Sequence, residues 1–197
     1  MTIKLALPTG DPRASVGELL ETAGIPVVGY EPSSRVLRSV NETGGITSRV
    51  FREKDIPIQV ALGNYDLGIC SDLFLTELQV RFPLQRVVRI GSLPGAMSEV
   101  WLCASPQSGL PERTLPSAAS MDGARIVSEL PNLADIVAIH LRMPGYKLTP
   151  LRGSADAYPP EDAEFVLYPC AGPEVAAAKG LVPLARIATT GFDARMA

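Results

Sequence analysis

Short apolar runs of two different periods open the chain. In residues 3–7 large apolar side chains alternate with smaller or charged ones, which predicts a strand. In residues 12–23 apolar side chains recur with i, i+3, i+4, i+7 spacing, which predicts an amphipathic helix. Asp11 is a suitable N-cap for that helix, and Gly24 is a suitable end. The opening segment is therefore a strand–loop–helix unit, the usual start of an α/β fold.

Strand and helix patterns continue to alternate along the rest of the chain. Turn-rich segments separate them, and residues 105–120 are an irregular connection rich in Pro and Ser. We expect two α/β lobes, with the first formed by residues 1–92 and by 173–197 returning to it, and the second formed by 93–172. Further strands are predicted at 36–40, 46–51, 66–70, 86–90, 99–104, 125–130, 148–151, 164–168 and 181–187, and helices at 55–62, 133–140 and 173–179.

The composition supports a folded chain with many short elements. Of 197 residues 46% are hydrophobic and 20% are charged, which is enough apolar side chain for a substantial core. The 17 glycines and 18 prolines argue against a coiled coil or a simple helical bundle. A formal net charge of −3 argues against a general nucleic-acid binder.

Residue counts exclude several classes of site. Three cysteines without a CxxC pair support neither a disulfide framework nor a structural zinc site, and we assign no metal ligands. With His140 as the single histidine, a site built from several histidines is excluded. The apolar run in residues 1–8 is too short for a signal peptide or a membrane span, so we expect a cytoplasmic location.

Residues 52–69, REKDIPIQVALGNYDLGI, form the most distinctive stretch of the sequence. They resemble the segment R-x-x-D-[IV]-P-x-x-V-x-x-G-x-x-D-L-G-I of ATP phosphoribosyltransferases, the first enzymes of histidine biosynthesis. Every fixed position of that pattern is filled. Locally, the stretch reads as a helix that ends at Gly63 and a strand in which the small Gly68 permits a close backbone approach.

Four shorter segments extend the resemblance in the same order along the chain. Residues 5–11 are similar to the family's opening A-L-P-K-G-R, and Ser34-Arg35 is similar to its S-R pair. Residues 125–133 resemble R-I-A-T-K-Y-P-N, and residues 151–159 resemble L-N-G-S-V-E-x-A-P. The length of the chain fits the family's short form.

The resemblance implies a fold and a reaction. The fold would be the two-lobed periplasmic-binding-protein type II arrangement, with a ligand cleft between the lobes. The reaction would join ATP to phosphoribosyl pyrophosphate with release of pyrophosphate, and it would use Mg²⁺. The family also implies a homo-oligomer and, for the short form, a separate regulatory subunit related to histidyl-tRNA synthetase.

Candidate binding residues follow from the matched segments, whereas no catalytic residue is identified. Arg35 and Arg52 could contact phosphate groups, or they could be solvated charges on exposed strands. Asp66 opens a strand and could face the ligand, or it could secure the turn at 63–65. The full set of expected substrate-binding residues is Gly10, Arg35, Arg52, Asp66, Gly153, Ser154, Asp156, Gly172 and Glu174.

The sequence departs from the family at charged ligand positions. The phosphoribosyl-pyrophosphate loop D-x-x-x-T-G-x-T corresponds to residues 168–174, YPCAGPE, where Gly172 remains and Glu174 adds negative charge. Thr9 and Asp11 replace the Lys and Arg of the opening loop, where Arg13 is the remaining cation. These changes leave a second hypothesis open, a non-catalytic or repurposed small-ligand-binding homologue.

One further replacement and one separate segment involve acidic side chains. Ser128-Glu129 stands where the family has T-K, which reverses the charge at that position. The acidic segment 161–164 is either a solvated loop or a carboxylate pair for Mg²⁺ or acid–base chemistry.

Overall fold

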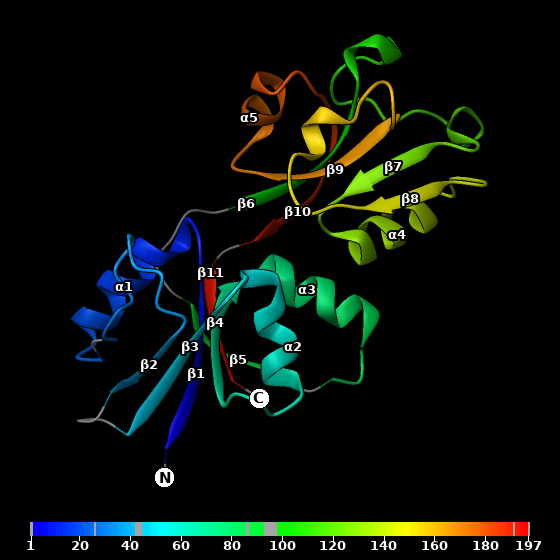
Figure 1. Ribbon diagram of the computed structural model, residues 1–197. Helices are drawn as coiled ribbons and strands as arrows, with labels where there is room; N and C mark the ends of the chain where they lie inside the picture. The colour runs from blue at the N-terminus through cyan, green and yellow to red at the C-terminus, as the bar shows by residue number, and fades with distance from the viewer. Residues whose placement is uncertain are drawn as a thin grey trace. The chain divides into compact units, whose positions relative to one another are not determined.

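The computed structural model describes residues 2–25, 27–41, 45–85, 87–92, 98–190 and 192–196. The chain divides into two compact units, each built around its own sheet (Figure 1). The first unit consists of Met1–Gly95 with Gly191–Ala197, and the second of Ala96–Thr190. The predicted α/β class with two lobes is therefore confirmed.

A six-stranded sheet forms the centre of the first unit. Its strand order is β2-β3-β1-β4-β11-β5, and β1 is parallel to both β3 and β4. β2 is antiparallel to β3, and β11 is antiparallel to β4 and β5. The strands are β1 (Ile3–Pro8), β2 (Arg38–Asn41), β3 (Ile46–Phe51), β4 (Leu67–Ser71), β5 (Val88–Ser92) and β11 (Phe192–Met196).

Helices cover both faces of this sheet, as strands with buried residues on both sides require. α1 (Pro12–Thr22) lies on one side, and α2 (Ile56–Ala61) and α3 (Asp72–Arg81) lie on the other (Figure 1). A short 3-10 helix, η1 (Glu53–Asp55), leads into α2. The core under α1 contains Leu5, Leu7, Val16, Leu20, Tyr30, Val50 and Ile69, and the core under α2 and α3 contains Ala6, Ile56, Val60, Cys70, Leu75, Leu78 and Val87.

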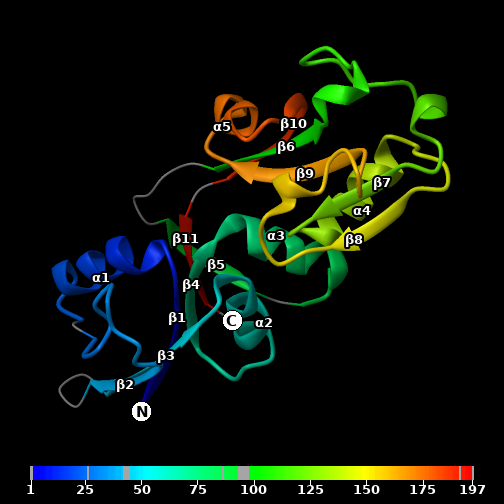
Figure 2. The same ribbon diagram turned by 45° about the horizontal axis from the view of Figure 1, so that its top comes forward.

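The second unit has a five-stranded sheet of order β10-β6-β9-β7-β8. β7 is parallel to β8 and β9, whereas β6 is antiparallel to β9 and β10. α4 contacts β7 and β8, and α5 contacts β9 and β10 (Figure 2). The elements are β6 (Ser98–Ala104), η2 (Pro106–Ser108), η3 (Ala118–Met121), β7 (Arg125–Ser128), α4 (Pro131–His140), β8 (Lys147–Pro150), η4 (Ala155–Ala157), β9 (Phe165–Cys170), α5 (Pro173–Ala178) and β10 (Val182–Thr190).

The sequence analysis did not predict one α-helix, α3, and one strand, β11. α3 begins at its N-cap Ser71, whose hydroxyl accepts a hydrogen bond from the Leu73 amide at 3.2 Å. β11 is short, and it pairs with β4 on one side and with β5 on the other.

Asp11 precedes α1 as expected but makes no side-chain capping bond, because its backbone is already helical.

The expected boundaries of the lobes need one correction. The first boundary was placed after residue 92, and the observed one follows Gly95. The chain re-enters the first unit at Gly191, however, and not at 173. The reason is that β10 pairs with β6 from Val182 to Thr190, which keeps α5 and β10 in the second unit. The expected first strand residue Arg86 and the crossover at 93–97 lie outside the described residues.

Gly68 permits the close approach of α2 to β4. A Cβ atom at Gly68 would lie 2.6 Å from Ile56 Cγ2 and 2.9 Å from Val60 Cγ2, both fully buried. Such distances are shorter than van der Waals contact, so only glycine fits beneath the helix. The expectation of a close backbone approach at Gly68 is confirmed.

Asp66 lies at the amino end of β4, away from the edge where ligands bind in parallel sheets. Its Oδ2 accepts the Lys4 amide at 2.7 Å, and its own amide donates to the Lys4 carbonyl at 3.0 Å. The two bonds join the starts of β1 and β4. The Asp66 carboxylate therefore secures the start of β1, whereas the amides of Asn64 and Tyr65 in the expected turn donate to the Gln59 carbonyl. A role of Asp66 in ligand binding stays a prediction.

Among the described residues, no helix has the length and apolar character that a membrane span requires.

Gly68→Ala is expected to lower the free energy of unfolding by about 1–3 kcal/mol, because the added methyl group overlaps Ile56 and Val60. Urea unfolding monitored by circular dichroism measures the change. Gly91→Ala is the matched control, since a Cβ there meets no atom within 4 Å. Equal stability of the two variants would contradict the packing of α2 on β4.

Asp66→Asn is expected to lower the free energy of unfolding by about 1 kcal/mol, because the bond from the Lys4 amide loses its charged acceptor. Thermal unfolding measures the effect. Asp11→Asn serves as the control, since Asp11 makes no side-chain capping bond. A loss of the same size in the control would show that the Asp66 bond contributes nothing specific.

Candidate functional site

The carboxyl ends of β1, β3 and β4 meet at one edge of the first unit's sheet, because the three strands are parallel. Gly10 follows β1 and Arg52 follows β3, so both lie at this edge. Gly10 has a φ of +85°, a conformation that favours glycine, and its carbonyl accepts the Arg13 amide at 3.0 Å. Arg52 is exposed. In open α/β sheets this edge is the usual ligand-binding edge.

Arg35 comes to the same edge through the pairing of β2 with β3. Arg38 pairs with Arg49, and the Leu37 carbonyl accepts the Val50 amide at 2.9 Å. Since β2 runs antiparallel to β3, Arg35 in the loop before β2 lies on the side of the carboxyl end of β3. Arg35 is exposed like Arg52, so the edge offers two solvent-accessible guanidinium groups to an anion.

Arg13, the remaining cation near the opening loop, has a different role from the other two arginines. Its side chain is only 5% exposed, and its guanidinium donates to the carbonyls of Gly29 and Tyr30 at 2.9 and 3.4 Å. It also lies 4.9 Å from the centre of the Tyr30 ring. A guanidinium so engaged is not presented to a ligand.

Glu53 brings a half-buried carboxylate to the same edge. It accepts the backbone amide of Ser71, at the start of α3, at 2.5 Å. Burial raises the pKa of Glu53 above its usual value, and the bond from Ser71 opposes that rise. The Glu53 carboxylate therefore lies at the amino end of α3, where the helix dipole favours a negative charge.

The second unit gathers a different set of residues at the carboxyl edge of its parallel strands. Gly153, Ser154 and Asp156 follow β8 in a tight loop, in which Gly153 and Ser154 have φ values of +110° and +55°. Asp156 Oδ2 lies 3.7 Å from Lys179 Nζ at the end of α5. The loop and α5 share the core of the unit through Ala155 and Ala176. The three residues and the end of α5 therefore lie together, and their role in substrate binding stays a prediction.

Gly172 and Glu174 lie together after β9. Gly172 is the residue before α5 and has an extended backbone. A Cβ atom at Gly172 would overlap both carboxylate oxygens of Glu174, so the carboxylate lies directly against the glycine. The negative charge expected from the sequence thus occupies the space above Gly172.

Further acidic groups surround Tyr168 and Cys170 at this edge. Burial raises the pKa of Tyr168, and the negative charges of Asp156 and Glu129 add to the rise. Glu99 pairs across the strands with Cys170, and its carboxylate accepts hydrogen bonds from the Trp101 indole at 2.7 Å and from Arg186 at 3.0 Å. The second unit's edge is therefore rich in carboxylates.

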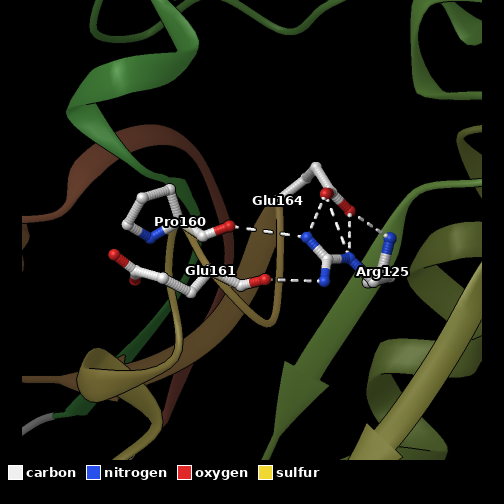
Figure 3. A network of polar contacts seen from close by, with 4 residues as sticks. All are labelled: Arg125, Pro160, Glu161 and Glu164. Carbon is white, nitrogen blue, oxygen red and sulfur yellow. Dashed lines mark hydrogen bonds and ion pairs between the residues drawn. The ribbon is translucent and has the colours of Figure 1, made fainter.

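One carboxylate of the acidic segment 161–164, that of Glu164, is engaged in an ion pair. Glu164 is bound by Arg125, with Nη2–Oε1 at 2.6 Å and Nε–Oε1 at 3.1 Å (Figure 3). The same guanidinium donates to the carbonyls of Glu161 at 2.7 Å and Pro160 at 3.4 Å. The hydrogen bonds from Arg125 lower the pKa of Glu164. In the described residues no group of three or more His, Cys, Asp or Glu side chains could hold a metal.

The predicted residues thus fall into two sets and one exception. One edge of the first unit holds Gly10, Arg35 and Arg52, and one edge of the second unit holds Gly153, Ser154, Asp156, Gly172 and Glu174. Asp66 is at the opposite edge. Sequence reasoning missed the buried roles of Arg13 and Glu53, for which the sequence carries no signal, because their partners are backbone groups distant along the chain.

Comparison with known proteins gives one sequence relative and a clear fold. No protein-family model matches the chain. An ATP phosphoribosyltransferase of Moorella thermoacetica is 36% identical over 75 residues, which cover 38% of this chain and 33% of the relative. The match therefore spans a third of the length of that curated relative.

Solved structures match over the whole chain. The ATP phosphoribosyl transferase (HisG:HisZ) complex from Thermotoga maritima has a TM-score of 0.79 at 19% identity, covering 99% of this chain and 87% of that one. The periplasmic aliphatic sulphonate binding protein SsuA from Escherichia coli has a TM-score of 0.53 at 18% identity, covering 100% of this chain and 61% of that one. The chain therefore has the periplasmic-binding-protein type II fold and resembles the short-form ATP phosphoribosyltransferases.

Proposed function

We propose that the chain is a phosphoribosyltransferase of the ATP phosphoribosyltransferase type, which joins ATP to phosphoribosyl pyrophosphate and releases pyrophosphate. The observation that carries the proposal is the stretch 36% identical to a protein of that name, on a fold shared over 99% of the chain with another. The exposed Arg35 and Arg52 at the first unit's carboxyl edge support it, since the reaction needs cations that bind polyanions.

In this proposal the protein acts mainly by binding and orienting two charged substrates. Arg35 and Arg52 would hold phosphate oxygens through charge-assisted hydrogen bonds. Gly153 and Ser154 form a tight turn beside Asp156, whose carboxylate would accept hydrogen bonds from ribose hydroxyls. As pyrophosphate leaves, the guanidinium groups would stabilise the charge that develops on it.

Mg²⁺ would enter with the pyrophosphate oxygens. Magnesium in such sites uses one or two carboxylates together with substrate phosphates. In the second unit Asp156 could supply such a carboxylate if its ion pair with Lys179 opened. A homo-oligomer, a regulatory subunit related to histidyl-tRNA synthetase and a cytoplasmic location stay predictions.

Release of pyrophosphate from ATP, phosphoribosyl pyrophosphate and Mg²⁺, with and without a regulatory subunit, tests the proposal directly. Arg35→Ala is expected to weaken ATP binding about tenfold in calorimetry, because a charge-assisted contact is lost. Arg81→Ala is the matched control, since Arg81 ends α3 at the opposite edge of the sheet and lies against Phe82. Absence of pyrophosphate release in every setting, with no binding of either substrate, would refute the proposal.

A second candidate function is a small-ligand-binding protein without catalysis. The position of Glu174 favours it, because the carboxylate against Gly172 would repel a phosphate group in the loop after β9. The acidic groups near Tyr168 add to that repulsion. The ligand would then carry no phosphate group at this place.

Glu174→Gln is expected to raise the affinity for ribose 5-phosphate about tenfold, because the repelling charge is removed with little change in volume. Calorimetry measures the affinity. Glu112→Gln, an exposed acidic residue in the loop after η2, controls for net charge. If both variants bind ribose 5-phosphate as the parent does, Glu174 does not decide which anions the loop accepts.

A further inference from the structure

A buried arginine joins the two arms of one loop in the first unit. The loop, residues 29–36, runs between α1 and β2. Arg13 Nη2 donates to the Gly29 carbonyl at 2.9 Å and to the Val36 carbonyl at 3.4 Å, and Nε donates to the Tyr30 carbonyl at 3.4 Å. One planar guanidinium therefore contacts both the start and the end of the loop.

Tyr30 connects the same loop to the central strand. Its hydroxyl donates to the Pro8 carbonyl at the end of β1 at 2.6 Å, and its side chain is 3% exposed. The Arg13 guanidinium lies 4.9 Å from the centre of the Tyr30 ring, a cation–π distance. The loop, α1 and the carboxyl end of β1 are thus joined through two side chains.

The loop itself is closed tightly around these contacts. Gly29 has a φ of +79°, and a Cβ at Gly29 would lie 3.1 Å from the Cβ of Val36. The Ser34 amide donates to the Glu31 carbonyl at 2.9 Å, and the Val36 amide donates to the Ser34 hydroxyl at 3.1 Å. Because the arms touch, a contact that holds one arm also holds the other.

Arg35 lies directly before two successive residues whose carbonyls accept hydrogen bonds. The Val36 carbonyl accepts from Arg13, and the next carbonyl, that of Leu37, accepts the Val50 amide of β3 at 2.9 Å. We propose that Arg13 is a positioning residue that acts through loop 29–36 to place Arg35 beside Arg52 at the ligand edge. This inference rests on the proposed function, in which Arg35 binds a phosphate group.

Arginine is suited to this role for a geometric reason. The contacts require donors in one plane that reach carbonyls at residues 29, 30 and 36. A lysine ammonium carries its three donors on one atom and has no planar face to stack on Tyr30. Arg13→Lys therefore keeps the positive charge but cannot reach all three carbonyls at once.

The test combines amide hydrogen exchange with calorimetric binding of ATP in full-length protein. Arg13→Lys is expected to speed exchange in residues 29–37 while residues 67–71 of β4 exchange as before, and to weaken ATP binding about fivefold. Tyr30→Phe, which removes only the hydroxyl, is expected to act in the same direction and guards against a misfolded Arg13 variant. Unchanged exchange of residues 29–37 in both variants would overturn the inference whatever happens to binding.

A double-variant cycle separates positioning from a general structural effect. In an Arg35→Ala background, Arg13→Lys is expected to cause no further loss of ATP affinity, because the residue it positions is absent. The same fivefold loss in that background would overturn the inference. If Arg35→Ala alone leaves ATP affinity unchanged while Arg13→Lys still speeds exchange of the loop, the assignment of Arg35 in the proposed function fails and the contact between Arg13 and the loop stands.

Discussion

The parallel pairing of β1 with β3 on one side and β4 on the other determines where the functional groups of the first unit lie. Parallel strands end at the same edge, so the segments after them are brought together however far apart they are in sequence. At the end of β1, the Pro8 carbonyl accepts a hydrogen bond from the Tyr30 hydroxyl. Near the start of β1, the Lys4 amide donates a hydrogen bond to the Asp66 carboxylate. The same three-strand arrangement thus has one edge joined by the Asp66 bond and an opposite edge at which Arg52 is exposed.

The carboxyl edges of the parallel strands carry different charged side chains in the two units. The first exposes Arg35 and Arg52, whereas its carboxylate Glu53 is occupied by the Ser71 amide. The second carries Asp156 paired with Lys179, and Glu174 against Gly172.

Local sequence signals predicted the elements whose apolar period is regular. The strand at residues 3–7 and the helix at 173–179 are present within a residue or two. α3 and β11 were missed for different reasons. The leucines of α3 are buried by packing against β4 and do not form a strong stripe, and β11 gains its hydrogen bonds from β4 and β5. Neither fact is visible in a window of ten residues.

The sequence by itself determined the α/β class, the small residue required at Gly68 and the charge of the loop that carries Glu174. These properties depend on residue type and on the local period of apolar side chains, and both can be seen directly in the sequence. Only the tertiary structure decided that Asp66 joins two strand starts, that Arg13 is buried against carbonyls of residues 29–36, and that residues 182–190 stay in the second unit. In each case the partner is a backbone group many residues away, and backbone groups are the same at every position of a sequence until the fold brings particular ones together.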